Sequence, residues 1–134
     1  MIFGTDMKEN EIGKIVVDAA IAVHRELGPG LMETVYEIIL AHELKQRGLQ
    51  VERQVRVSIE YRGILFDEGY RADIILNDCV LIELKSVKKL TAAHRKQIQT
   101  YLRLAGMQLG FLLNFGEALM KDGIIRAVNG LKET

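Results

Sequence analysis

The chain has 134 residues, and its 18 basic and 18 acidic side chains cancel to a formal net charge of zero. This length fits one domain with a core of its own and is too short for two. Because the chain has no net charge, no overall field attracts nucleic acid, and any polyanion has to be bound by a local patch of basic residues.

Cys79 is the only cysteine. A single cysteine excludes an internal disulfide and a cysteine-rich metal site, and it fits a reducing compartment. The sequence has no run of about 18 apolar residues that could span a membrane, and its first residues lack a basic region followed by an apolar one. We therefore expect a cytoplasmic, unprocessed protein with no membrane partner.

The first third of the chain predicts two helices. Apolar residues recur at helical spacing from about residue 10 to Leu27, and Gly28-Pro29-Gly30 ends this helix. A second helix is predicted for residues 31–47, with Gly48 as its stop. Its apolar side is predicted to consist of Leu31, Val35, Ile38, Ile39 and His42.

The rest of the chain predicts five strands and one more helix. Residues 50–61 and 64–76 are rich in Val, Ile and Tyr, with breaks at Arg62-Gly63 and around Glu68-Gly69. A third strand covers residues 80–87, and Thr91 is the expected N-cap of a helix that ends at Leu104 or Ala105. Strands at 109–115 and 124–128 complete the order ααβββαββ. The helix between the third and fourth strands is a crossover of the kind that joins parallel strands.

Two carboxylates and a lysine interrupt the apolar pattern of the second and third strands. In the third strand Val80, Ile82 and Leu84 alternate with Leu81, Glu83 and Lys85, and successive side chains of a strand point to opposite faces. In the strand before it, Ala72, Ile74 and Leu76 alternate in the same way with Asp73 and Ile75.

The two apolar faces match only if Ile74 lies opposite Ile82. This register places Asp73 opposite Glu83. It requires a loop with an odd number of residues, most simply the three-residue loop Asn77-Asp78-Cys79, because a two-residue turn would put the carboxylates on opposite faces.

Neighbouring carboxylates repel each other unless a cation neutralises them. Oxygen ligands suit Mg²⁺ or Mn²⁺, and Lys85, on the face of Glu83, can hold an attacking water and offset charge in a phosphorane-like transition state. The alternative is an ion cluster without function. Burying charge costs several kcal/mol per ion, which makes such a cluster a poor stabilising device.

Two further polar pairs share a helix face. Glu33 and Tyr36 are three residues apart in the second helix, and Gln97 and Tyr101 are four apart in the third. Each pair fits a site, but a glutamate in a first helical turn also favours the helix dipole, and a Gln/Tyr pair is also ordinary half-buried packing.

Five motifs together resemble a known family. They are Gly-Leu-Met-Glu-Thr-Val-Tyr at 30–36, Tyr-Arg-Ala-Asp at 70–73, Glu-Leu-Lys at 83–85, the pair Gln97 and Tyr101, and Leu-Asn-Phe-Gly at 113–116. In this order they closely resemble the GxxExxY family of the PD-(D/E)XK nuclease superfamily. The one departure is Ala72, which stands where the superfamily's name has a proline.

The resemblance implies a single PD-(D/E)XK nuclease-like domain over residues 1–134, with a restriction-endonuclease-like core in which helices flank a mixed sheet. It implies that Asp73, Glu83 and the Leu84 carbonyl bind the metal and that Lys85 is the catalytic lysine. Glu33 would complete the site through a water on the metal, and Gln97 would orient the substrate. Tyr36 and Tyr101 would be supporting residues that contact substrate.

The expected reaction is Mg²⁺- or Mn²⁺-dependent hydrolysis of phosphodiester bonds in nucleic acid, with DNA preferred and RNA left open. A basic patch between the third strand and the third helix could hold the nucleic-acid backbone. It consists of Lys88, Lys89, Arg95 and Lys96, with His94. The alternative for this patch is a solvated helix start.

Two other functions are compatible with the sequence. A non-catalytic module that binds nucleic acid or protein could retain the nuclease fold, although the intact Asp73, Glu83 and Lys85 argue against it. A small-molecule phosphodiesterase would use the same metal site. The small size of the chain suggests that a partner or a homodimer supplies target recognition. A zinc hydrolase is disfavoured, because the sequence has neither a closely spaced His pair nor Cys ligands.

Overall fold

This computed structural model describes residues 7–132. Its elements are α1 (Glu9–Leu27), α2 (Glu33–Gln46), β1 (Val51–Tyr61), β2 (Ile64–Leu76), β3 (Val80–Lys85), α3 (Ala92–Ala105), β4 (Leu109–Asn114), the short 3-10 helix η2 (Met120–Asp122) and β5 (Ile124–Val128). The predicted helices and strands are confirmed to within two residues at their ends, and η2 is an addition to them. Within residues 7–132, no helix is both long and apolar enough to cross a membrane.

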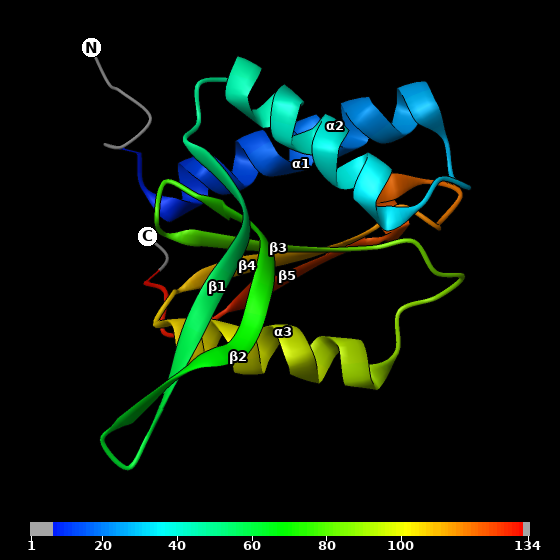
Figure 1. The fold of residues 1–134 in the computed structure, drawn as a ribbon. Coiled ribbons are helices and arrows are strands. Elements are labelled where there is room, and N and C mark those ends of the chain that lie inside the picture. Colours follow the sequence, from blue (N-terminus) through cyan, green and yellow to red (C-terminus); the bar gives the residue numbers. More distant parts are fainter. Residues whose placement is uncertain (1–6, 133–134) are drawn as a thin grey trace.

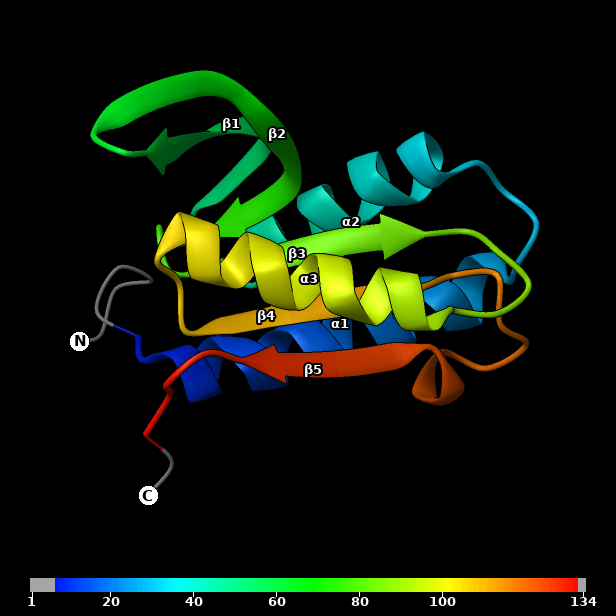
Figure 2. The same ribbon diagram turned by 90° about the horizontal axis from the view of Figure 1, so that it is seen from below.

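The five strands form one sheet in the order β1-β2-β3-β4-β5. β3 and β4 run parallel, and every other neighbouring pair is antiparallel. α3 connects the two parallel strands and covers one face of the sheet, while α1 and α2 cover the other face (Figures 1 and 2). The predicted α/β fold, a mixed sheet flanked by helices, is thereby confirmed.

The sheet separates two apolar clusters. The larger lies under α1 and α2 and includes Val16, Leu40, Ile74, Ile82 and Phe111. The smaller lies under α3 and includes Ile75, Leu81, Ile98, Leu102 and Ala127. All six residues of β4 are buried, because this central strand is covered on both faces. The framework around β3 and β4 is therefore fixed from both sides.

The predicted apolar side of α2 is wrong. Its buried residues are Tyr36, Glu37, Leu40, Ala41 and Leu44. Leu31, Val35, Ile38 and His42 are exposed. Of the predicted side, Ile39 is partly buried and packs against the core. α2 carries apolar side chains on both sides, so periodicity could not choose between them. Tyr36 and Glu37 decide the orientation, because their polar atoms find partners in the interior.

Tyr36 closes the turn between α1 and α2. Its ring is fully buried and stacks on Phe115, with ring centroids 4.4 Å apart. Its hydroxyl donates to the Gly28 carbonyl and accepts from the Leu31 backbone N–H at 3.1 Å. A buried tyrosine of this kind combines apolar packing with a satisfied polar end.

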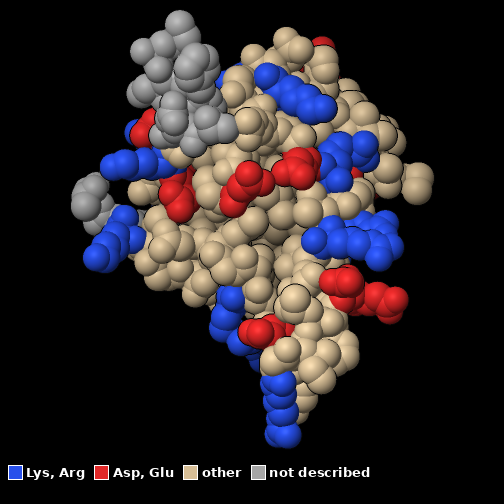
Figure 3. All heavy atoms as spheres, turned by 60° about the vertical axis from the view of Figure 1, so that its left-hand side comes forward, with Lys and Arg blue, Asp and Glu red and all other residues tan. Residues whose placement is uncertain are grey.

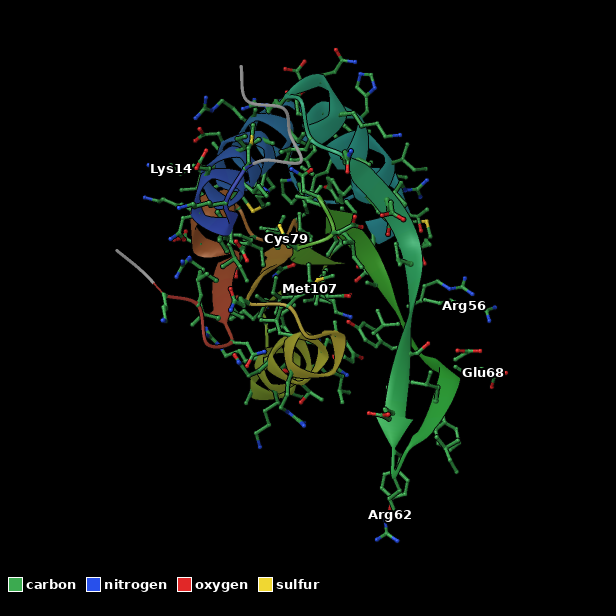
Figure 4. The ribbon with its side chains drawn as sticks, turned by 90° about the vertical axis from the view of Figure 1, so that its left-hand side faces the viewer. Lys14, Arg56, Arg62, Glu68, Cys79 and Met107 are labelled. Atoms are coloured by element: carbon green, nitrogen blue, oxygen red, sulfur yellow. The ribbon has the colours of Figure 1, made fainter. Side chains whose placement is uncertain are left out.

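The far end of the β1–β2 hairpin projects beyond the other three strands of the sheet, with Arg62 at its tip (Figure 4). β2 runs through Glu68 and Gly69, so the predicted break there is instead a register shift within a continuous strand. A Cβ on Gly69 would lie 2.9 Å from the Val57 carbonyl oxygen and closer still to Ile59. The irregularity therefore depends on glycine at this position.

We expect Tyr36→Phe to lower the free energy of unfolding by about 1 kcal/mol, because the Gly28 carbonyl and the Leu31 N–H lose their partner. Chemical denaturation monitored by circular dichroism measures this change. An unchanged free energy of unfolding would show that the α1–α2 turn does not depend on the Tyr36 hydroxyl.

Candidate functional site

The β2–β3 hairpin has the predicted register. Ile74 lies opposite Ile82, and a three-residue turn of Asn77, Asp78 and Cys79 connects the strands. Asn77 and Asp78 both have positive φ angles, and the Cys79 N–H donates to the Leu76 carbonyl at 2.9 Å. Asn and Asp tolerate this left-handed conformation better than most residues. The turn thereby gives the odd loop length that puts Asp73 and Glu83 in opposing positions.

The backbone ladder between β2 and β3 ends at Ile74 and Ile82, one position before the two acids. Beyond it, the Leu84 N–H donates to Oδ2 of Asp73 at 2.8 Å. The Asp73 side chain thus accepts a hydrogen bond from the backbone of β3. This bond holds the Asp73 carboxylate against β3.

The predicted face of Ala72 is wrong. Ala72 packs in the cluster under α3, whereas Ile74 and Leu76 pack in the cluster under α1 and α2. β2 therefore changes face at Asp73. The neighbouring strand β1 is irregular at the same level. Gln54 falls between the Arg53–Ile74 and Val55–Ala72 pairs, level with Asp73, and has a φ of 54°. A left-handed residue interrupts the regular alternation of a strand.

Glu83 and Asp73 form a mutually unfavourable pair of charges. Burial, followed by the negative charge of Asp73, raises the pKa of Glu83 to about 9, and the positive charge of Lys85 opposes this shift. Oε1 of Glu83 is buried and has no hydrogen-bond partner. A buried oxygen of this kind is costly unless something binds to it.

These donors fit a hard divalent cation. Mg²⁺ accepts one or two carboxylates and keeps several waters, and Mn²⁺ prefers similar oxygen ligands. Within residues 7–132 no group of three or more His, Cys, Asp or Glu side chains is arranged as a metal site. Asp73 and Glu83 offer carboxylate oxygens, the ligand type that Mg²⁺ and Mn²⁺ prefer.

A small cavity of about 50 Å³ adjoins Glu83 and Lys85. The other polar side chains that line this cavity are His94, Gln97 and Tyr101 of α3. α3 and β3 therefore meet at the same site. Tyr101 stacks on Tyr70 with ring centroids 3.9 Å apart, and burial followed by the charge of Glu83 raises the pKa of both hydroxyls.

Thr91 is the N-cap of α3, as predicted, and it sets the orientation of His94. The Thr91 hydroxyl accepts from the His94 N–H at 3.3 Å, and Nδ1 of His94 accepts from the Thr91 N–H at 3.0 Å. This reciprocal capping box fixes the start of the helix that carries Gln97 and Tyr101.

Glu33 and Tyr36 have different surroundings although both lie in the first turns of α2. Glu33 is exposed, and its Oε1 accepts from the Ser86 N–H at 3.3 Å, one residue beyond Lys85. Ser86 also donates from its hydroxyl to the Leu31 carbonyl at 2.8 Å. Glu33 thus reaches the end of β3, whereas the Tyr36 hydroxyl is bonded within the α1–α2 turn.

The predicted basic patch is only partly assembled. Lys89 and Arg95 line one shallow depression, and they share it with Glu117 and Asp122. Lys88 and Lys96 are exposed on the loop before α3 and on α3 itself. Another face of the molecule, shown in Figure 3, carries basic and acidic side chains intermixed. Contact with a polyanion through the predicted patch would therefore depend on a few positions.

Asn114 is a supporting residue whose role the sequence did not indicate. It is fully buried and lies beside Lys85 in the parallel β3–β4 pairing. Its Oδ1 accepts from the N–H groups of Val87 and Gly116 at 3.0 and 3.1 Å. A Cβ on Gly116 would lie 2.1 Å from the Val87 carbonyl oxygen. Asn114 and Gly116 therefore hold the chain that follows Lys85, and the polar ending of an otherwise apolar strand was the available signal.

Two more residues near the carboxylates were missed. Glu37 is buried on α2, and Gln54 lies between Glu37 and Asp73. A carboxylate four residues after Glu33, within an apolar helix, could have indicated Glu37. Gln54 gives no signal, because only its left-handed backbone brings it to this place.

Two helices on one face of a mixed five-stranded sheet, a crossover helix on the other and an acidic hairpin that ends in Glu-Leu-Lys define a nuclease-like core. The family model described as PD-(D/E)XK nuclease superfamily matches residues 10–127, and the chain belongs to this superfamily. Searches of curated proteins and of solved structures gave no match.

The raised pKa of Glu83 predicts how metal-free protein responds to pH. The folded protein keeps a proton on Glu83 up to pH about 9, whereas the unfolded chain loses it near 4.5. The folded state thus binds more protons in this interval, so the free energy of unfolding should fall as pH rises through it. Thermal melts in EDTA across these pH values measure the effect.

Glu83→Gln should flatten this pH dependence, while the control Glu26→Gln on α1 should leave it unchanged. Mg²⁺ should raise the melting temperature of the wild type more at pH about 9 than at pH about 5, since metal binding requires a deprotonated carboxylate. Identical pH profiles for Glu83→Gln and wild type would show that Glu83 is an ordinary carboxylate.

Proposed function

We propose that this protein is a nuclease of the GxxExxY type that hydrolyses phosphodiester bonds of nucleic acid, DNA before RNA, with Mg²⁺ or Mn²⁺. The observation that carries the proposal is the pairing of Asp73 with Glu83 beside Lys85, with a buried and unpartnered Glu83 oxygen. Membership of the nuclease superfamily over residues 10–127 supports it further. We take residues 1–134 as one domain of this kind, acting in the cytoplasm.

Asp73, Glu83 and the Leu84 carbonyl would hold the metal. When bound, it would supply Lewis-acid polarisation of the phosphate and make a water more acidic. Lys85 then has two tasks in the same step. Its ammonium group hydrogen-bonds the attacking water and holds it in line with the scissile bond, and its charge offsets the negative charge that develops on phosphorus oxygens.

The reaction needs no covalent enzyme intermediate. The water releases one proton to solvent as its oxygen forms a bond to phosphorus, the bond from phosphorus to the leaving oxygen breaks, and the leaving oxygen takes up a proton from solvent. Glu33 would orient water from the far side of Lys85, where its Oε1 accepts from the Ser86 N–H. Gln97 and Tyr101, which line the cavity at Glu83 and Lys85, would orient the phosphodiester.

Substrate binding outside this cavity would depend on basic side chains. Lys88 and Lys89 lie on the loop before α3, and Arg95 and Lys96 lie in its first turns. Each contact with a phosphate releases counterions, so affinity would fall steeply with salt. Tyr36 would contribute indirectly, because its hydrogen bonds hold the α1–α2 turn that positions α2.

The test is cleavage of labelled single- and double-stranded DNA and RNA, with Mg²⁺ or Mn²⁺ against EDTA. We expect metal-dependent cleavage that falls by at least about 100-fold in Lys85→Ala and Glu83→Ala, since each removes a group that stabilises the transition state. Lys14→Ala on α1 is the matched control and should cleave normally (Figure 4).

Other outcomes would favour the alternatives. Metal and nucleic-acid binding without cleavage would indicate a non-catalytic binding module. Hydrolysis of simple phosphodiesters, with no retention of DNA or RNA, would indicate a small-molecule phosphodiesterase. Cleavage that persists in both Lys85→Ala and Glu83→Ala would remove these residues from the mechanism.

We also propose a homodimer, formed through the exposed apolar side of α2. Val35 and Ile38, three residues apart on α2, are 38% and 50% exposed and share one side of the helix. Apolar side chains gathered in this way are typical of an interaction surface. Ile38→Glu should shift sedimentation from dimer to monomer while the circular dichroism spectrum of the folded protein is retained, and its melting temperature should no longer depend on protein concentration. A wild type that sediments only as a monomer would remove this proposal.

A further inference from the structure

A buried carboxylate on α2 organises the strand that faces Asp73. Glu37 is 4% exposed, and both of its oxygens are used. Its Oε2 accepts from Arg53, with Nε at 2.9 Å and Nη2 at 2.8 Å. Its Oε1 accepts from Nε2 of Gln54 at 2.7 Å. Arg53 offsets the charge of Glu37, so the carboxylate can remain buried.

The backbone at Gln54 is what allows this arrangement. Successive side chains of a regular strand point to opposite faces, so Arg53 and Gln54 could not both reach one carboxylate. The left-handed conformation of Gln54, with a φ of 54°, lets them do so. This conformation is uncommon outside glycine, and such residues concentrate at functional sites.

Gln54 also connects Glu37 with the proposed metal site. Its Nε2 lies 3.5 Å from Oδ1 of Asp73, while Oδ2 of Asp73 accepts from the Leu84 N–H at 2.8 Å. Both carboxylates beside the amide are acceptors, so the amide has to present its nitrogen, with one N–H for each of them. Glu37 thereby fixes which end of the amide faces Asp73.

We infer that Gln54 and Glu37 are positioning residues that hold the Asp73 carboxylate in the orientation needed to share a metal with Glu83. This inference rests on the proposed metal site. Gln54 brings a neutral donor rather than a third negative charge, so it orients Asp73 without adding to the repulsion between Asp73 and Glu83. Removing a partner that orients a metal ligand in this way commonly weakens metal binding about 10- to 100-fold.

The experiment is calorimetric titration of Mn²⁺ into the metal-free protein without nucleic acid. Gln54→Ala should weaken Mn²⁺ binding about 10-fold, and Glu37→Gln should weaken it by a smaller factor, because the amide is then free to rotate. Gln46→Ala at the end of α2 is the matched control and should bind as the wild type does. Asp73→Asn and Glu83→Gln should abolish binding.

Melting of the same metal-free variants separates positioning from a purely structural role. A residue that only stabilises the fold would lower the melting temperature and leave the Mn²⁺ dissociation constant unchanged, and this result for Gln54→Ala and Glu37→Gln would overturn the inference. If those variants bind Mn²⁺ normally while Asp73→Asn and Glu83→Gln do not, the proposed function survives and the inference alone fails. A wild type that binds no Mn²⁺ would overturn both.

Discussion

The repulsion between Asp73 and Glu83 is the constraint on which the functional interpretation of this structure depends. The apolar faces of β2 and β3 fix a register in which these two acids oppose each other, and the three-residue turn at Asn77, Asp78 and Cys79 maintains it. Burial, followed by the negative charge of Asp73, raises the pKa of Glu83. The hairpin gains its apolar packing only by bringing together two carboxyl groups, whose charge is relieved by a proton on Glu83 or by a bound cation.

The remainder of the fold supports this hairpin from three directions. α2 reaches the end of β3 through Glu33 and Ser86. α3 brings Gln97 and Tyr101 to the other side of Glu83 and Lys85. β4 fixes the chain after Lys85 through Asn114. Each contact comes from a different element, so the site depends on the whole crossover arrangement.

The sequence predicted the element order and the register of β2 and β3, because these follow from alternation, helical spacing and turn chemistry. The roles of Gln97 and Tyr101 came from the family resemblance and stay predictions. The sequence failed for α2, where apolar residues occupy both sides and the partners of Tyr36 and Glu37 decide which side is buried. It also failed for Ala72 and Gln54. The change of face at Asp73 depends on a left-handed backbone at Gln54, and no residue pattern indicates that conformation at a glutamine.

A crystal structure of the protein grown with Mn²⁺, examined for anomalous scattering, tests the central claim most directly. The account predicts an anomalous peak within coordinating distance of both Asp73 and Glu83, about 2 Å from oxygen ligands. A structure with Mn²⁺ bound elsewhere, or with Asp73 and Glu83 on opposite faces of the sheet, would contradict it.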